Sequence, residues 1–218
     1  MNERNSTLAR RATILAAVFL AAAAVTAIYV ISRGPGNVET AQCAPAQARQ
    51  SAIAPFATGD VAAFQVADTP VPIEGLTFRD GDGASRAIEE WRGRTVLLNL
   101  WATWCAPCRE EMPALEALER AMGGADFAVV AVSVDLGEAD KPRQFYVETG
   151  LTDLPFFHDG SMGVFNALKK RSLAIGMPTS LLIDAEGCLL GSMSGPADWA
   201  GADARALIEA ALRSRPDD

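Results

Sequence analysis

The stretch from Val96 to Cys108 reads VLLNLWATWCAPC and decides the fold of this chain. It begins as an apolar run typical of a buried strand and ends in two cysteines that are three positions apart. An acidic pattern with leucines at helical spacing follows at once. Two thiols at the junction of a strand and a helix are typical of a redox site.

The junction predicts that the two sulfurs differ. Cys105 would lie at or just before the helix N-terminus, where unpaired backbone N–H groups and the helix dipole stabilise a thiolate, so it is the expected nucleophile. Pro107 suits the first helical turn because that turn does not need its missing N–H. Cys108, one turn further in, is the expected resolving thiol, more buried than Cys105.

The cysteine pair also has two structural interpretations. A structural zinc site needs four ligands, and outside the pair the chain offers only Cys43, Cys188 and its single histidine, His158. A purely structural disulfide is disfavoured because a pair at a helix start exchanges readily. His158 precedes a turn, so we expect it at the surface or in a local cap rather than in catalysis.

The rest of the chain alternates between strand and helix patterns. The run FAVVAVSV at 127–134 is continuously apolar, as expected for a strand buried on both faces. Further elements are expected as a hairpin start at 76–80 with a turn at 80–83, a short helix at 88–91, helices at 140–149, 162–170 and 198–213, and antiparallel strands within 180–194. This order predicts an α/β fold.

Three motifs identify a family resemblance: LNLWATWCAPCREEMP at 98–113, GMPTS at 176–180 and DAEG at 184–187. From about Pro70 to Arg213, the chain resembles the TlpA-like branch of thioredoxin-fold membrane thiol:disulfide oxidoreductases. The resemblance implies a three-layer sandwich, with a central mixed β-sheet, helices on both faces and a TlpA-type βα insertion. It implies no cofactor and no resident metal.

The resemblance also implies which residues meet the substrate. Pro178 matches a proline that is cis in the thioredoxin superfamily and faces the two thiols, so that Met177 presents its backbone to an extended substrate. Trp104, Ala106 and Pro107 would contact the substrate beside Cys105.

Glu111 is the expected proton-handling group. Thioredoxin has a buried Asp where this chain has Asn99, and related extracytoplasmic reductases keep a Glu beside their thiols at the position of Glu111. A carboxylate that gains a proton as a thiolate forms is a plausible general acid/base. The alternative is that Glu110 and Glu111 only complement the helix dipole at a solvated face; we prefer it for Glu110 and leave it open for Glu111.

Cys43 and Cys188 are the remaining cysteines. The resemblance implies that they match a second, structural disulfide of TlpA-like proteins. Two free thiols are the alternative, which is less common outside the cytoplasm. The bond would close a loop of about 145 residues and stabilise the fold by roughly 5 kcal/mol in the chain-entropy model.

The N-terminal region predicts a membrane attachment. Residues 12–31 are uncharged, largely apolar and long enough to span a bilayer, and three arginines at 4, 10 and 11 precede them. We therefore expect a cytoplasmic tail at 1–11, a transmembrane anchor at 12–31, a periplasmic linker at 32–60 and a thioredoxin-like domain at 61–218. A cleaved signal peptide is disfavoured because the run ends in bulky residues rather than an A-x-A-like site.

Charge agrees with this topology. The first eleven residues carry +2 and the whole chain −8, so the remainder carries −10. An acidic domain argues against nucleic acid or an anionic lipid surface as a partner, and favours proteins with neutral or basic patches around their cysteines.

The resemblance finally implies an activity and partners. Proteins of this branch act mainly as reductants of protein disulfides and are recharged by a transmembrane electron donor of the DsbD or CcdA type. The implied targets are copper-site cysteines of cytochrome oxidase subunit II and of its Sco-type copper chaperone. Two alternatives stay open: reduction of apocytochrome CxxCH disulfides in cytochrome c maturation, and a copper-binding protein that passes the metal on.

Overall fold

Two strands with every side chain buried form the middle of the sheet in the computed structural model, which describes residues 42–213. They are β4 (Thr95–Trp101) and β5 (Phe127–Ser133), and they pair in parallel along their full length. Their lack of polar alternation is explained by this position, since a central strand is covered on both faces. The strand predicted at 127–134 is thereby confirmed.

The whole sheet has eight strands in the order β1-β8-β7-β4-β5-β6-β2-β3. It is mixed, because β5 and β6 (Phe157–His158) pair in parallel whereas β7 (Thr179–Ile183) runs antiparallel to β4. The other antiparallel strands are β1 (Gln65–Val66), β2 (Thr77–Asp80), β3 (Ser85–Ala87) and β8 (Leu189–Ser194).

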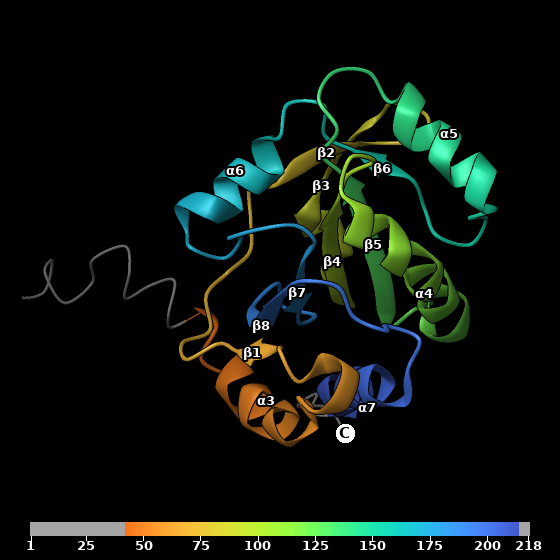
Figure 1. Ribbon diagram of the computed structural model, residues 1–218. Helices are drawn as coiled ribbons and strands as arrows, with labels where there is room; N and C mark the ends of the chain where they lie inside the picture. The colour runs from red at the N-terminus through yellow and green to blue at the C-terminus, as the bar shows by residue number, and fades with distance from the viewer. Residues whose placement is uncertain (1–41, 214–218) are drawn as a thin grey trace, which may run out of the picture. The chain divides into compact units, whose positions relative to one another are not determined.

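Helices flank this sheet (Figure 1). The helix α4 (Ala106–Met122) packs on β5, and α6 (Gly163–Lys170) contacts β2. The crossover from β5 to β6 contains α5 (Asp140–Thr149), which has the bounds expected from the sequence. The closing helix α7 spans Ala202–Arg213, and a short 3₁₀ helix, η3, spans Ile88–Trp91. The thioredoxin-like α/β fold with a mixed central sheet is confirmed.

The segment expected as a linker at 32–60 is folded from Cys43 onward, so that boundary is wrong. The helix α3 (Ala46–Ile53) packs on β8 and α7, and two 3₁₀ turns, η1 (Ala54–Phe56) and η2 (Gly59–Val61), continue it. The compact unit accordingly starts at Cys43. This segment lacks an amphipathic stripe, but Arg49 and Gln50 are buried against the turn between β7 and β8.

The expected cytoplasmic tail and transmembrane anchor lie outside the described residues. Within residues 42–213, no helix is both long enough and apolar enough to cross a bilayer.

Candidate active site

The two cysteines occupy the junction between β4 and α4 as the sequence predicts. Cys105 is the N-cap residue of α4 and has an extended backbone (φ −94°, ψ 103°). A disulfide joins it to Cys108, and the backbone N–H of Cys108 donates to Cys105 Sγ over 3.3 Å. Cys105 is 6% exposed and Cys108 is 0% exposed.

This placement makes the two sulfurs chemically unequal. In the reduced protein, a thiolate at Cys105 is held by the same N–H donor and by the positive end of the α4 dipole. Cys108 lies inside the helix, where this end effect is weaker and solvent does not reach. This asymmetry suits Cys105 to attack an external disulfide and Cys108 to act as the resolving thiol.

The residues expected to meet the substrate surround Cys105. Trp104 is 62% exposed, Ala106 is exposed and Pro107 is half-buried at the first turn of α4. The peptide bond from Met177 to Pro178 is cis and leads directly into β7. Because Thr179 pairs with Leu100 near the end of β4, this bond lies at the same edge of the sheet as the thiols.

Glu111 lies one turn after Cys108 on α4 and is 3% exposed, so it does not sit on a solvated helix face. Its Oε1 accepts from Asn99 Nδ2 over 2.8 Å. Its Oε2 accepts from the backbone N–H of Ala197 over 3.1 Å and from Trp199 Nε1 over 3.2 Å. All three donors favour the carboxylate, whereas burial opposes it.

Burial is the stronger influence and raises the pKa of Glu111 to about 7, although the donors from Asn99, Ala197 and Trp199 oppose it. A carboxyl that titrates near neutral pH is suited to exchange protons with a thiol. Glu111 also lines an open pocket of about 410 Å³ with Asp60, Glu110 and Asp198. Glu110, by contrast, is exposed.

Asn99 can form a hydrogen bond with either protonation state of the Glu111 carboxyl group. Its Nδ2 also donates to Ser180 Oγ over 3.0 Å, while its Oδ1 is buried and has no partner among the residues described here. An amide offers both a donor and an acceptor, so a half-turn of Asn99 would present an acceptor to protonated Glu111.

The sequence missed two features of this site. Trp199, which no motif of the sequence marks, donates to Glu111 from 88 positions away. Asp135, after β5, holds the loop before Cys105: its Oδ2 accepts from the backbone N–H of Thr103 (2.9 Å) and from Ser133 Oγ (2.8 Å). The sequence carries one signal for Asp135: the hydrophobic strand before it ends in Ser-Val-Asp.

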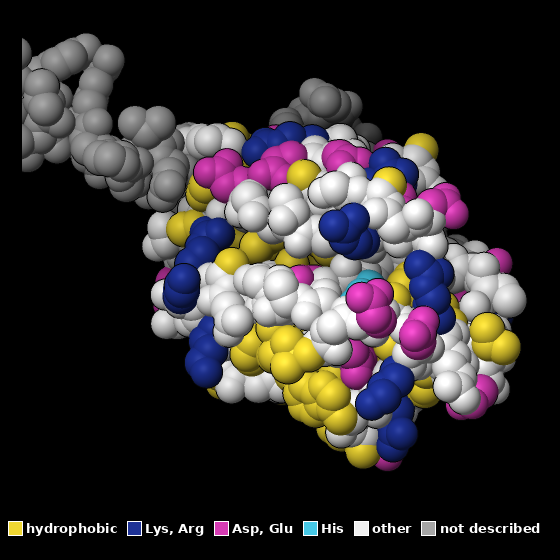
Figure 2. All heavy atoms as spheres, turned by 90° about the horizontal axis from the view of Figure 1, so that it is seen from above, with side chains coloured by type: hydrophobic (Ala, Val, Ile, Leu, Met, Phe, Trp, Pro, Cys, Tyr) yellow, Lys and Arg dark blue, Asp and Glu magenta, His cyan; other side chains and the backbone are white. Residues whose placement is uncertain are grey.

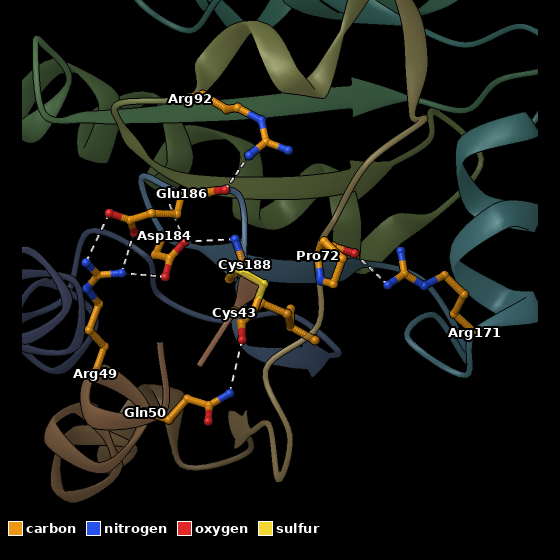
Figure 3. The surroundings of a disulfide bond; sticks show 10 residues. Cys43, Arg49, Gln50, Pro72, Arg92, Arg171, Asp184, Glu186 and Cys188 are labelled. Atoms are coloured by element: carbon orange, nitrogen blue, oxygen red, sulfur yellow. Dashed lines mark hydrogen bonds and ion pairs between the residues drawn. A yellow bond between two sulfur atoms is a disulfide. The ribbon is translucent and has the colours of Figure 1, made fainter. Parts of the chain in front are cut away.

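The remaining cysteines form a second disulfide, in which Cys43 and Cys188 are 0% and 1% exposed (Figure 3). Arg49 Nη1 forms a buried ion pair with Asp184 Oδ2 over 2.6 Å, and Arg49 also binds Glu186. Gln50 Nε2 donates to Leu189 O over 3.1 Å. Covalent and polar contacts together fasten the start of the folded unit to the β7–β8 turn.

The zinc alternative required Cys43, Cys188 and His158 beside the first cysteine pair. Cys43 and Cys188 are instead bonded to each other. His158 was expected at the surface or in a local cap, but it is buried in β6 with 6% of its surface exposed. Its Nε2 lies 2.8 Å from Asp135 O. In residues 42–213, no three His, Cys, Asp or Glu side chains form a group that could hold a metal ion.

Comparisons with known proteins agree with this geometry. Residues 61–208 match the Redoxin family. The chain is 33% identical over 110 residues to Thioredoxin-like protein YneN of Bacillus subtilis, with 49% of this chain and 60% of that protein covered. It is 35% identical over 113 residues to Thiol-disulfide oxidoreductase ResA of Geobacillus kaustophilus, covering 51% of this chain and 61% of ResA.

A solved structure of a thiol:disulfide interchange protein of the thioredoxin family from Chlorobium tepidum is similar with a TM-score of 0.55. The two chains are 25% identical, and the match covers 66% of this chain and 97% of the other. The matched part spans about three fifths of the length of the curated relatives YneN and ResA.

Proposed function

The chain belongs to the Redoxin family, and from this premise we propose that it is a thiol:disulfide oxidoreductase that reduces disulfides in other proteins. The observation that carries the proposal is the placement of Cys105 at the N-cap of α4 with Cys108 buried one turn inside. The names of ResA and of the Chlorobium tepidum protein support the same reaction class.

The reaction starts from the reduced dithiol. The thiolate of Cys105 attacks one sulfur of the target disulfide, and the other target sulfur leaves as a thiolate that takes up a proton. Cys108 then loses its proton and attacks Cys105 Sγ, which releases the second target sulfur as a thiol. Two electrons pass to the target, which ends as two thiols, and the protein ends with the Cys105–Cys108 disulfide.

Glu111 serves as the base for Cys108, directly or through one water. It follows Cys108 by three positions on α4, so the two side chains share a face of the helix. Its pKa of about 7 lets it accept the thiol proton and return it to solvent through the pocket that it lines.

In finer detail, we propose a TlpA-type reductant that is anchored in the bacterial inner membrane by residues 12–31 and faces the periplasm. A donor of the DsbD or CcdA type restores the dithiol. The targets are the copper-site cysteines of cytochrome oxidase subunit II and of a Sco-type chaperone. The motif around Cys105 and the apolar run after three arginines support this assignment.

The target is tested with pre-reduced, full-length protein from which free reductant has been removed. It is mixed with oxidised Sco-type protein, with the oxidised copper domain of subunit II, and with a CxxCH peptide disulfide from an apocytochrome. We expect the two copper-site proteins to be reduced at least ten times faster than the CxxCH peptide. Faster reduction of the CxxCH peptide would contradict the copper-site assignment and favour cytochrome c maturation.

A further inference from the structure

A second pocket adjoins the redox site on the side of the β5–α5 loop. It has a volume of about 490 Å³. Three apolar side chains line it, from the residue before Cys105, from the loop and from the N-cap of α6; they are Trp104, Leu136 and Met162. Three acidic residues and one basic residue complete the lining: Asp135, Glu138, Asp140 and Lys141. We refer to this pocket as the loop groove.

The loop groove is fixed to the redox site by hydrogen bonds. Asp135, which lines the pocket, accepts through its carboxylate from the backbone N–H and the hydroxyl of Thr103, which directly precedes Trp104. Asp135 is 5% exposed, and its two oxygens are occupied by these donors and by Ser133. The loop and the segment that carries Cys105 are therefore held in one arrangement.

The apolar part of the loop groove is unusually exposed. Trp104 is 62% exposed and Leu136 is 71% exposed; Ile175, two positions before Met177, is 82% exposed but does not line this pocket. Large apolar side chains left in water mark an interaction surface when they cluster. In the part of the chain that is described, Val147 on α5 is the one other large hydrophobic residue with such exposure.

The charged part of the loop groove is acidic. Glu138 and Asp140 are exposed, and no ion pair involving them or Lys141 is present among residues 42–213. The two carboxylates outnumber the single ammonium group. On the face shown in Figure 2, acidic side chains (magenta) lie next to hydrophobic ones (yellow).

We propose that the loop groove binds the substrate segment next to the target disulfide and selects basic side chains in that segment. The inference rests on the proposed function. Exchange requires a target sulfur within bonding distance of Cys105 Sγ, so the substrate must cover the surface beside Trp104. An aliphatic stem can lie against Trp104 and Leu136 while its cationic end faces Glu138 and Asp140, as lysine and arginine side chains do.

Two synthetic peptides test this selection. Both contain one intramolecular disulfide and differ only in flanking residues, which are lysines in one and glutamates in the other. Pre-reduced full-length protein is mixed with each, and the ratio of the two second-order rate constants is measured at low salt. We expect the lysine peptide to react at least threefold faster, with the ratio falling towards one in 0.5 M salt.

Glu138→Lys is expected to reduce this ratio by about threefold or more, because it replaces attraction by repulsion. The matched control is Glu148→Lys, which makes the same change of charge at the exposed far end of α5 and should leave the ratio unchanged. Both peptides are measured in the same preparation, so an inactive fraction cancels from the ratio. Glu138→Gln and Glu148→Gln repeat the comparison with a milder change.

The inference is overturned if Glu138→Lys has the same ratio of peptide rate constants as wild type. It is also overturned if Glu148→Lys lowers that ratio as much as Glu138→Lys does, because the preference would then depend on net charge alone. Bis(2-hydroxyethyl) disulfide, which is small and neutral, separates this outcome from failure of the proposed function. If the wild-type protein reduces that compound but does not discriminate between the peptides, the function stands and the loop groove does not select charge. If wild type reduces none of the three, the proposed function fails.

Discussion

Glu111 occupies an environment in which burial and hydrogen bonding act in opposite directions. Three donors hold its carboxylate, but 97% of its surface is removed from water, and the pKa settles near 7. A carboxyl poised at neutral pH exchanges its proton as readily as a histidine does. In the proposed reaction, Glu111 therefore supplies the acidic group that is absent at Asn99.

Glu111→Gln should slow the resolving attack of Cys108 by about 100-fold at pH 8. In the wild-type protein this step accelerates as pH rises through about 7, because Glu111 becomes ionised and can accept the thiol proton. The variant should lose that inflection. Stopped-flow fluorescence of exposed Trp104 during a single oxidation at pH 5 to 9 measures the step. An unchanged rate and profile would leave Glu111 only a packing role.

Trp199→Phe should move the same inflection to higher pH. The substitution keeps an aromatic ring but removes the Nε1–H donor to Glu111 Oε2, which favours the ionised form, so the pKa of Glu111 rises further. The rate well above the new inflection should match that of wild type. Trp91→Phe is the control, because that indole packs with Phe78 and Phe157 away from Glu111. An inflection that stays in place would contradict the positioning role of Trp199.

At the scale of residues, sequence spacing was sufficient for contacts within one turn. It placed Cys105, Cys108 and Glu111 on the first two turns of α4, where the structure also has them. The spacing could not place Trp199, because its contact with Glu111 depends on how the loop after β8 returns to α4. The burial of His158 likewise depends on a partner 23 positions earlier.

At the scale of elements, strands and helices with a clear apolar pattern were predicted well, and α3 was not. The helix α3 has the sequence AQARQSAI, whose polar residues resemble a linker. Its Arg49 and Gln50 are buried and form hydrogen bonds with Asp184 and Leu189. These partners lie 135 and 139 positions away in the sequence. Such long-range polar pairing leaves no local periodicity in a sequence.

Removing the anchor of α3 should destabilise the protein measurably. Cys43→Ala with Cys188→Ala should lower the free energy of unfolding by about 2–5 kcal/mol, since the closed loop spans 145 positions. Arg49→Ala should cost about 3 kcal/mol because Asp184 is left buried without its cation. Urea unfolding of full-length protein measures both changes.

The control for this pair is Arg86→Ala, which removes an exposed ion pair with Asp80 and should leave stability nearly unchanged. Neither anchor variant should abolish disulfide exchange, because Cys105 and Cys108 belong to other elements. Unfolding midpoints for the anchor variants that match those of wild type would show that α3 contributes little to the fold.

At the scale of the whole molecule, the order of strands and helices could be predicted because each buried element has a continuous or periodic apolar pattern. The sheet order could not be read from those patterns alone, since it depends on the crossover through α5 and on the late strand β7 inserting beside β4. That topology was predicted from the resemblance of the CxxC and cis-proline motifs to those of thioredoxin-fold proteins.

Glu111 should also leave a signature in the stability of the whole molecule. Its folded-state pKa of about 7 exceeds the ordinary value of 4.5, so the folded protein binds this proton more tightly than the unfolded chain does. The contribution is therefore fully present below pH 4.5 and is lost as pH rises through 7, a change of about 3 kcal/mol. The unfolding free energy of wild type minus that of Glu111→Gln should fall by this order between pH 4.5 and 8. A difference that is constant with pH would contradict the raised pKa.

The central claim, that Cys105 attacks and Cys108 resolves, is tested most directly by trapping with full-length protein. Cys108→Ser, pre-reduced and mixed with an oxidised target protein, should accumulate as a mixed disulfide through Cys105, identified by mass mapping of the non-reduced digest. Cys105→Ser should form no such adduct at a comparable rate. A mixed disulfide through Cys108 in the Cys105→Ser variant, formed as fast as the expected one, would contradict the assignment.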